Sequence, residues 1–316
     1  MFPTEQSNVF LTALISQEGE QPWIYTSGIS EALNFVQMSF EDLLPKVKSA
    51  AKYLEYHTVK TKEMLDKTLA EIVEQNLPTE KQALWRAPSM YGNPEKQTVG
   101  GAIVSFMLRP CSFSSLVVFG ERQGVSPTFT SFKRWAGRMP EHFPDADKEL
   151  VRKYLHCYGP ATMDSFMDWL GCSQSQARRL WNTISDEMEP VQISGKTRYM
   201  LSADVDNLLR PECDGERLIL LAAHDPYLSM KDRSVILENK SFHKAVWKTV
   251  ANPGVILKGG RIVGIWKTKT LKGNLDVSMR AWETMKAAEQ HELKRLAEEY
   301  AAFRLLCLGS SVIENA

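Results

Sequence analysis

The sequence predicts an α+β protein built from tandem winged-helix units, a small antiparallel β-barrel and a long C-terminal helix. A pattern of three helices followed by a β-hairpin occurs twice, which chance rarely produces. Several short β-rich runs follow it, and a stretch with apolar residues at three- and four-residue steps comes last. The 316 residues are enough for two or three domains. A generic α+β domain without the repeat is the alternative.

The composition excludes several classes of protein. With 43% hydrophobic and 24% charged residues, long disorder, collagen-like repeats and coiled-coil rods are not expected. No window approaches 18 apolar residues, and no basic run precedes an apolar stretch at the start, so we expect a cytoplasmic protein. An odd number of cysteines without a C-x-x-C motif predicts reduced, mostly buried thiols and no disulfide framework. These are Cys111, Cys157, Cys172, Cys213 and Cys307.

The first winged helix is expected over residues 61–140, after residues 1–60, which we interpret as the helical remnant of an N-terminal domain. Its helices are recognised by a capping residue followed by apolar residues at helical spacing. The expected elements are a helix capped by Thr61, a helix from Thr79, a helix from about Thr98 to Leu108, and strands at 116–119 and 125–129.

The second winged helix is expected over residues 141–202. Thr162 and Ser173 are the side chains that cap its second and third helices, after a first helix over residues 146–157. Ser194-Gly195-Lys196 is the turn of a hairpin between two β-rich runs.

Residues 203–316 are expected to form a small, strongly twisted antiparallel sheet or barrel, of which we favour the barrel, and the closing helix. Hydrophobic runs at 218–221, 255–257, 261–266 and 275–279 predict its strands, and Lys258-Gly259-Gly260 predicts a tight turn. One helix is expected from about Glu283 to Leu306, packed across the barrel or the winged helices.

Three stretches, in this order, resemble one known family. They are Tyr154-Leu155-His156-Cys157-Tyr158-Gly159-Pro160-Ala161-Thr162, Leu220-Leu221-Ala222-Ala223-His224-Asp225-Pro226-Tyr227-Leu228, and 255–266, which reads Val-Ile-Leu-Lys-Gly-Gly-Arg-Ile-Val-Gly-Ile-Trp. Together they resemble the AlkZ-like winged-helix DNA-binding proteins. The resemblance implies tandem winged helices joined to a β-barrel, and a class of DNA glycosylases that release alkylated bases and unhook interstrand crosslinks.

The sequence also departs from that family. The family's catalytic signature is a Gln-apolar-Gln motif near the N-terminus, followed by a stretch like Arg-Gly-Thr-Leu-His, and neither is present. Gln174-Ser175-Gln176 has a polar central residue and is interpreted as a coincidence. His224 stands where the family more often has Phe. We therefore expect no catalytic residues, and a chain that lacks the family's first winged helix, either as a natural short form or as a gene model begun too late.

Charge is unevenly distributed along a chain with 38 basic and 38 acidic residues. The segment from Lys231 to Lys272 contains ten basic and two acidic residues, which gives it a net charge of +8. A local basic field attracts phosphates even on a neutral chain, although a solvated lysine-rich face is the simpler alternative. The predicted DNA-binding residues are Arg122, Lys133, Arg134, Arg178, Arg179, Lys196, Arg198, Lys244, Lys248, Lys267 and Lys269.

Chemistry other than DNA binding is weakly indicated. His224-Asp225 is a candidate acid/base pair, but Asp225 before Pro226 is as well explained by a turn. No metal-ligand spacing or phosphate-binding glycine loop is present, so no metal and no cofactor are expected. The expected partner is duplex DNA. The alternative function is a regulatory or scaffold protein, with a protein partner or a homodimer formed through the face that a missing first winged helix would leave.

Overall fold

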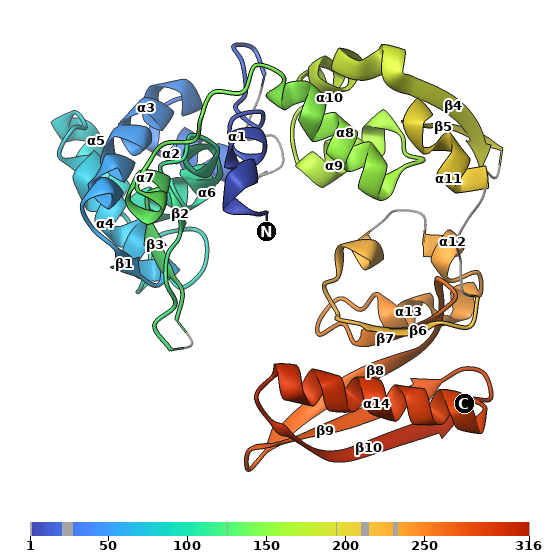
Figure 1. Ribbon diagram of the computed structural model, residues 1–316. Coiled ribbons are helices and arrows are strands. Elements are labelled where there is room, and N and C mark those ends of the chain that lie inside the picture. The colour runs from blue at the N-terminus through green and yellow to red at the C-terminus, as the bar shows by residue number, and fades with distance from the viewer. Residues whose placement is uncertain are drawn as a thin grey trace. The chain divides into compact units, whose positions relative to one another are not determined.

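The computed structural model describes residues 2–20, 28–124, 126–193, 195–209, 215–229 and 233–315. The chain divides into two compact units, Met1–Val205 and Asp206–Ala316, shown in Figure 1. Some residues used in the predictions above lie outside the described part: Val125, Ser194, Cys213, Lys231 and Asp232.

The first core of unit 1 is helical, with a small antiparallel sheet at its side in the strand order β1-β3-β2. Its elements are α2 (Ile29–Val36), α3 (Phe40–Ala51), β1 (Val59–Lys60), α4 (Lys62–Glu74), α5 (Thr79–Arg86), α6 (Val99–Phe113), β2 (Val118–Phe119), β3 (Thr128–Thr130) and α7 (Phe132–Ala136). The three predicted helices and the two strands are confirmed. One apolar cluster runs from Ile29 to Phe129, so residues 29–60 share a core with the elements that follow them.

Close contact between α5 and α6 depends on a glycine. A Cβ added to Gly100 would lie 2.2 Å from the indole of Trp85. That indole is 1% exposed and donates a hydrogen bond to the carbonyl oxygen of Ala70, at 3.0 Å. Gly100, near the start of α6, therefore lets a large aromatic side chain lie directly against the helix backbone.

The second core of unit 1 contains the second predicted set of elements. They are α1 (Ser7–Phe10), α8 (Ala146–Tyr158), α9 (Met163–Leu170), α10 (Gln174–Trp181), β4 (Met188–Ile193) and β5 (Lys196–Leu201). The hydroxyls of Thr162 and Ser173 accept hydrogen bonds from the first turns of α9 and α10, as predicted. Figure 1 shows the β4–β5 hairpin beside the three helices. Ala161 forms a further β-bridge to Tyr199.

Residues near the start of the chain complete this second core. Val9 and Ala13 pack among the side chains of α8 and α10. The amide of Gln176 donates a hydrogen bond to the carbonyl oxygen of Leu14, at 3.1 Å, and is 3% exposed. Gln176 therefore joins α10 to the segment that follows α1.

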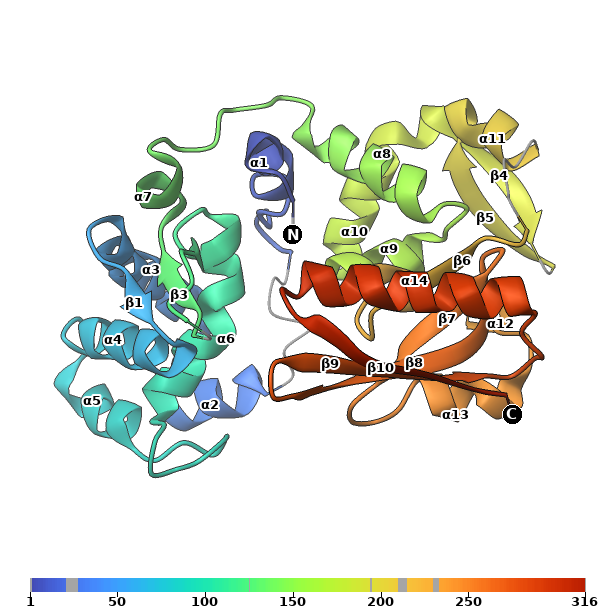
Figure 2. The same cartoon turned by 60° about the horizontal axis from the view of Figure 1, so that its bottom comes forward.

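Unit 2 is a five-stranded sheet with helices on both sides. After α11 (Val205–Leu209), its elements are β6 (Leu218–Leu221), α12 (Arg233–Ile236), α13 (His243–Val246), β7 (Gly254–Lys258), β8 (Arg261–Leu271), β9 (Asn274–Ala281), α14 (Ala287–Phe303) and β10 (Cys307–Asn315). One apolar cluster joins α14 to the sheet, and a second lies under α12 and α13. Figure 2 shows α14 on one side of the sheet and α13 on the other.

The prediction of a closed antiparallel barrel is wrong. The strand order is β10-β9-β8-β7-β6, and β10 and β6 do not pair in the described part of the chain. β10 runs parallel to β9, because α14 returns the chain across the sheet to the edge beside β9. The predicted helix is therefore shorter than expected, and the strand after it was not predicted.

The cysteines only partly match the prediction. Cys111 and Cys172 are buried, and burial raises their pKa values to about 12 and about 11, so both stay protonated at neutral pH. Cys157 and Cys307 are exposed instead. Among the described residues there is no cluster of side chains suited to a metal ion, and no described helix has the length and apolar character needed to cross a membrane.

Candidate nucleic-acid interface

The second core of unit 1 presents two exposed cations, one on α10 and one on β5. Arg178 lies on the outer side of α10, whose other side buries Ala177, Leu180 and Trp181. Lys196 begins β5 at the tip of the hairpin and is exposed. Neither side chain has a carboxylate partner among the described residues, so both cations are available to phosphates.

Arg179, next to Arg178, is occupied by contacts within the unit. Its guanidinium forms ion pairs with Glu20, at 2.7 Å, and with Asp147, at 2.6 Å. Burial alone would lower the pKa of Arg179, but the two carboxylates outweigh it and raise the pKa. This arginine joins the start of the chain to α8 and α10. Its predicted contact with DNA would require these ion pairs to break.

Arg198 is not on the open surface where it was expected. It is 8% exposed, because side chains alternate along β5 and Arg198 shares the inward side with Met200. Tyr199, on the other side of the strand, is exposed.

The cations around the β2–β3 hairpin and α7 differ in availability. Arg122, between the two strands, and Arg134, on α7, are exposed and have no carboxylate partner in the described structure. Lys133 instead forms an ion pair with Glu55, at 3.0 Å. The hydrogen bond to Glu55 raises the pKa of Lys133, so its charge is already balanced.

The four predicted lysines of unit 2 lie on one side of the sheet. Lys267 and Lys269 alternate with Trp266 along β8 and therefore point away from α14. Lys244 belongs to α13, which covers that same side, and Lys248 follows it closely. All four are exposed, and none has a carboxylate partner among the described residues.

Sequence reasoning missed two further cations of this unit. Arg280 pairs in register with Ile265, so it shares a side of the sheet with Lys267, and Arg233 begins α12. The signal for Arg280 was present, because it alternates with the buried Val277, Met279 and Ala281.

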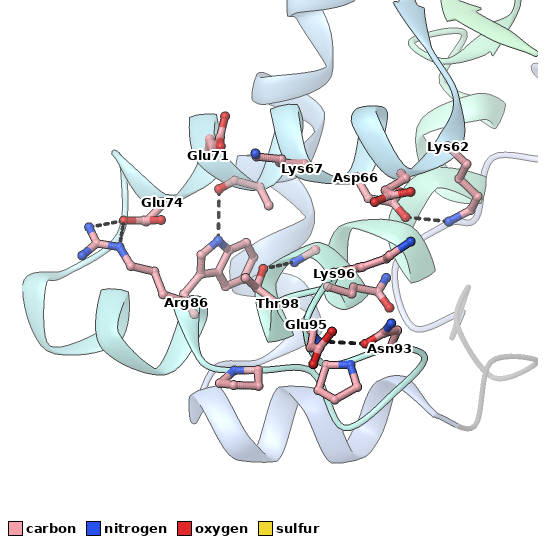
Figure 3. A pocket seen from close by; sticks show the side chains of 17 residues that line it. Lys62, Asp66, Lys67, Glu71, Glu74, Arg86, Asn93, Glu95, Lys96 and Thr98 are labelled. Atoms are coloured by element: carbon pink, nitrogen blue, oxygen red, sulfur yellow. Dashed lines mark hydrogen bonds and ion pairs between the residues drawn. The ribbon is translucent and has the colours of Figure 1, made fainter.

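A large hollow of about 750 Å³ in unit 1 is electrostatically unsuited to DNA (Figure 3). Its lining carries five carboxylates and four cations. Asp66 is largely buried within it and bonded by Lys62, at 2.8 Å, and Arg86 is paired with Glu74. Two of the four cations are thus paired with carboxylates of the same hollow, and the acids outnumber the bases in its lining, so the hollow gives no net positive field.

The structure shows no hydrogen bond between the two members of the candidate acid/base pair, His224 and Asp225, in the part of the chain that it describes. The carboxylate of Asp225 accepts a hydrogen bond from the backbone N–H of Tyr227, at 2.9 Å, as the turn interpretation predicted. His224 is exposed and, within the described residues, has no hydrogen-bond partner. The structure therefore shows no bond that would orient His224 as an acid or base.

Exposed cations thus lie on α10 and the hairpins of unit 1 and on one side of the sheet of unit 2. The profile of the DNA glycosylase AlkZ-like family matches residues 34–303, so the chain belongs to this family. The resemblance found in the sequence is thereby confirmed.

Two comparisons with individual proteins agree with this family. The interstrand DNA cross-link repair glycosylase of Streptomyces sahachiroi is 30% identical over 175 residues, which cover 51% of this chain and 45% of that protein. The match thus spans less than half of the curated relative. The solved structure of Streptomyces sahachiroi DNA glycosylase AlkZ superposes with a TM-score of 0.69 at 18% identity, covering 99% of this chain and 78% of that one, and shows a shared fold.

Proposed function

We propose that this protein binds duplex DNA through two winged helices and the lysine-bearing side of the unit 2 sheet. The observation that carries the proposal is the state of the predicted cations. Eight of the eleven are exposed and have no carboxylate partner in the described structure: Arg122, Arg134, Arg178, Lys196, Lys244, Lys248, Lys267 and Lys269. Phosphate contacts from such side chains provide most of the affinity of sequence-independent binding.

The element order supports winged helices in both cores of unit 1. In each, three helices precede a two-stranded hairpin, and in the second core Ala161 adds a short third pairing to the hairpin. In a winged helix the third helix and the hairpin are the parts that reach the grooves. Arg178 and Lys196 stand on those two parts of the second core.

We propose further that residues 1–316 bind DNA of the repair substrate class without releasing bases. Excision needs groups that position a water and stabilise charge in the transition state, and the family's Gln-apolar-Gln motif is not in this sequence. Loss of such groups lowers turnover more than affinity. The cytoplasmic location, and a protein partner or homodimer, stay predictions.

One experiment tests both statements. Binding of a fluorescent duplex is followed by anisotropy, with and without N-alkylated purines, and free base is measured in the same samples. We expect binding to both duplexes and no base release above the rate without protein. A lack of binding at low salt would refute the DNA proposal, and clear base release would refute the second statement alone.

A further inference from the structure

Two adjoining hollows in unit 2 lie where the sheet becomes narrower. β6 ends at Leu221 and β7 begins at Gly254, whereas β8 continues to Leu271. The last pair between β7 and β8 is Gly254 with Trp266, and the rest of β8 is paired with β9. The hollows of about 490 Å³ and 290 Å³ lie beside this step, within or near the usual size of ligand sites.

The two hollows form one groove around a histidine. Ala223, His224 and Asn252 line both, so we call the pair the His224 groove. Arg233 lines the smaller hollow and Lys267 the larger one. None of the described lining residues is an Asp or Glu. In a chain with as many acids as bases, such a lining concentrates positive potential in one concave place.

Asn252 offers the groove a hydrogen-bond donor. The side-chain oxygen of Asn252 accepts a hydrogen bond from the backbone N–H of Lys248, at 2.7 Å. This bond identifies the oxygen end of the amide, and the NH₂ group at the other end is a donor for a ligand. The amide orientation follows from this bond, since the reverse assignment would place two donors together.

Arg233 is held in place before any ligand arrives. Its guanidinium carbon lies 4.8 Å from the centre of the Trp247 ring, a cation–π contact. The indole N–H of Trp247 donates to the carbonyl oxygen of Leu228, at 2.9 Å, which fixes the ring. A guanidinium held over an aromatic ring retains N–H donors that can bind phosphate oxygens.

We infer that the His224 groove binds a phosphate group of the DNA backbone through Arg233, Asn252, Lys267 and His224. This inference rests on the proposed DNA binding. A phosphate offers only negative charge and acceptor oxygens, and the groove offers cations and donors. Lys248 and Lys269 continue on the same side of the sheet, so a strand that crosses the groove meets further cations. A free nucleotide is too short to contact these further cations.

The test uses the full chain and a fluorescent duplex at low salt. Asn252→Asp is the most informative variant, because the new carboxylate still accepts the Lys248 N–H but replaces the donor by a negative oxygen. Arg233→Glu removes the stacked cation, and His224→Phe keeps a ring and removes its nitrogens. Arg261→Glu is the matched control. Arg261 is an exposed cation on β8, the strand that carries Lys267, but it lies at the opposite end of that strand from the groove.

We expect Asn252→Asp and Arg233→Glu to weaken duplex binding about ten-fold, the loss of one charged hydrogen bond, and His224→Phe about three-fold. Arg261→Glu should change it less than about two-fold, since exposed charges far from a contact are screened. Thermal unfolding midpoints of Asn252→Asp and wild type should agree, which separates lost contacts from lost fold.

The outcomes separate the inference from the proposed function. A wild type that binds no duplex refutes the proposed function. If wild type binds duplex and every groove variant binds as well as Arg261→Glu, the inferred phosphate site in the groove is overturned and the proposed function stands. Calorimetric titration with adenosine monophosphate distinguishes the source of the phosphate. Binding of that nucleotide that Asn252→Asp abolishes, with duplex affinity unchanged in the variant, would also overturn the inference.

Discussion

Arg178 and Arg179 are neighbours on α10 with opposite environments. Arg178 is exposed and unpaired among the described residues, whereas the side chain of Arg179 is 22% exposed and meets Glu20 and Asp147. Sequence alone placed both on one DNA-binding helix. The structure separates a cation that is available to a ligand from one that stabilises the unit.

Substitution of the two arginines should separate binding from stability. Arg179→Ala leaves two carboxylates without their partner and should lower the free energy of unfolding by about 2 kcal/mol, less than a fully buried pair because the site is partly solvated. Arg178→Ala should change it by less than about 0.5 kcal/mol and weaken duplex binding instead. Urea denaturation and anisotropy measure the two effects. Equal losses of stability would contradict the assignment.

The carboxyl group of Asp66 should make stability depend on pH. Burial raises its pKa above the ordinary 3.8, even though Lys62 opposes this. The native state then holds the proton more tightly than the unfolded state, so stability is highest below the unfolded pKa and falls as pH rises through the folded pKa. The free energy of unfolding of wild type, minus that of Asp66→Asn, should therefore decrease from about pH 3 to pH 6. A difference that is constant or increases would contradict the burial.

At the scale of elements, the contact between α5 and α6 gives a paired test of packing. Gly100→Ala puts a methyl group 2.2 Å from the buried Trp85 indole and should destabilise the protein by about 2 to 3 kcal/mol. Gly101→Ala meets the Thr98 hydroxyl, at 3.4 Å, and the Gln97 side chain, at 3.6 Å, and should stabilise the helix by up to about 1 kcal/mol. Denaturation midpoints decide, and similar effects of both changes would show that Trp85 can move aside.

Elements encoded by neighbouring residues could be predicted from the sequence. Thr61, Thr162 and Ser173 begin their helices because a hydroxyl and the N–H three residues later lie in one short segment. β10 could not be found in this way, because its parallel pairing with β9 exists only once α14 has crossed the sheet.

The same limit explains which site residues were misjudged. To predict that Arg198 is buried, one must know which side of β5 faces the core. Alternation of side chains along the strand could have indicated that side. To predict the ion pair of Arg179, one must know that Glu20, 159 residues away along the chain, lies beside it. No local sequence pattern indicates such a distant partner. For Lys267 and Lys269, the side of the sheet follows from alternation along β8, which is a local property of the sequence.

At the scale of the whole molecule, net charge is a poor guide to DNA binding. The chain is neutral, yet Lys244, Lys248, Lys267 and Lys269 lie on one side of the unit 2 sheet without a carboxylate partner among the described residues. Each phosphate contact releases counterions, so the logarithm of the binding constant should fall against the logarithm of salt concentration with a slope between about −3 and −7, the upper bound being set by the eight exposed cations. Anisotropy at four salt concentrations measures it, and a slope near zero would contradict binding through phosphates.

A set of charge-reversal variants identifies the residues that cause this salt dependence. Lys244→Glu, Lys248→Glu and Lys267→Glu together should reduce its magnitude by about 3 and weaken binding equally for unrelated sequences. Lys294→Glu with Arg261→Glu is the control, since Lys294 lies on α14, on the other side of the sheet. An equal effect of the control set would mean that overall charge, and not this surface, governs binding.

The packing of Val9 and Ala13 against α8 and α10 also sets an order of events during synthesis. The contact between Leu14 and Gln176 closes a loop of 162 residues. At about 5 to 20 residues per second, the early segment leaves the ribosome roughly ten to thirty seconds before its partner helix is made. The first core can form in that interval, while the apolar side chains of α1 stay exposed. Chaperones that recognise short apolar segments should therefore bind this protein early, at a site that the finished fold conceals.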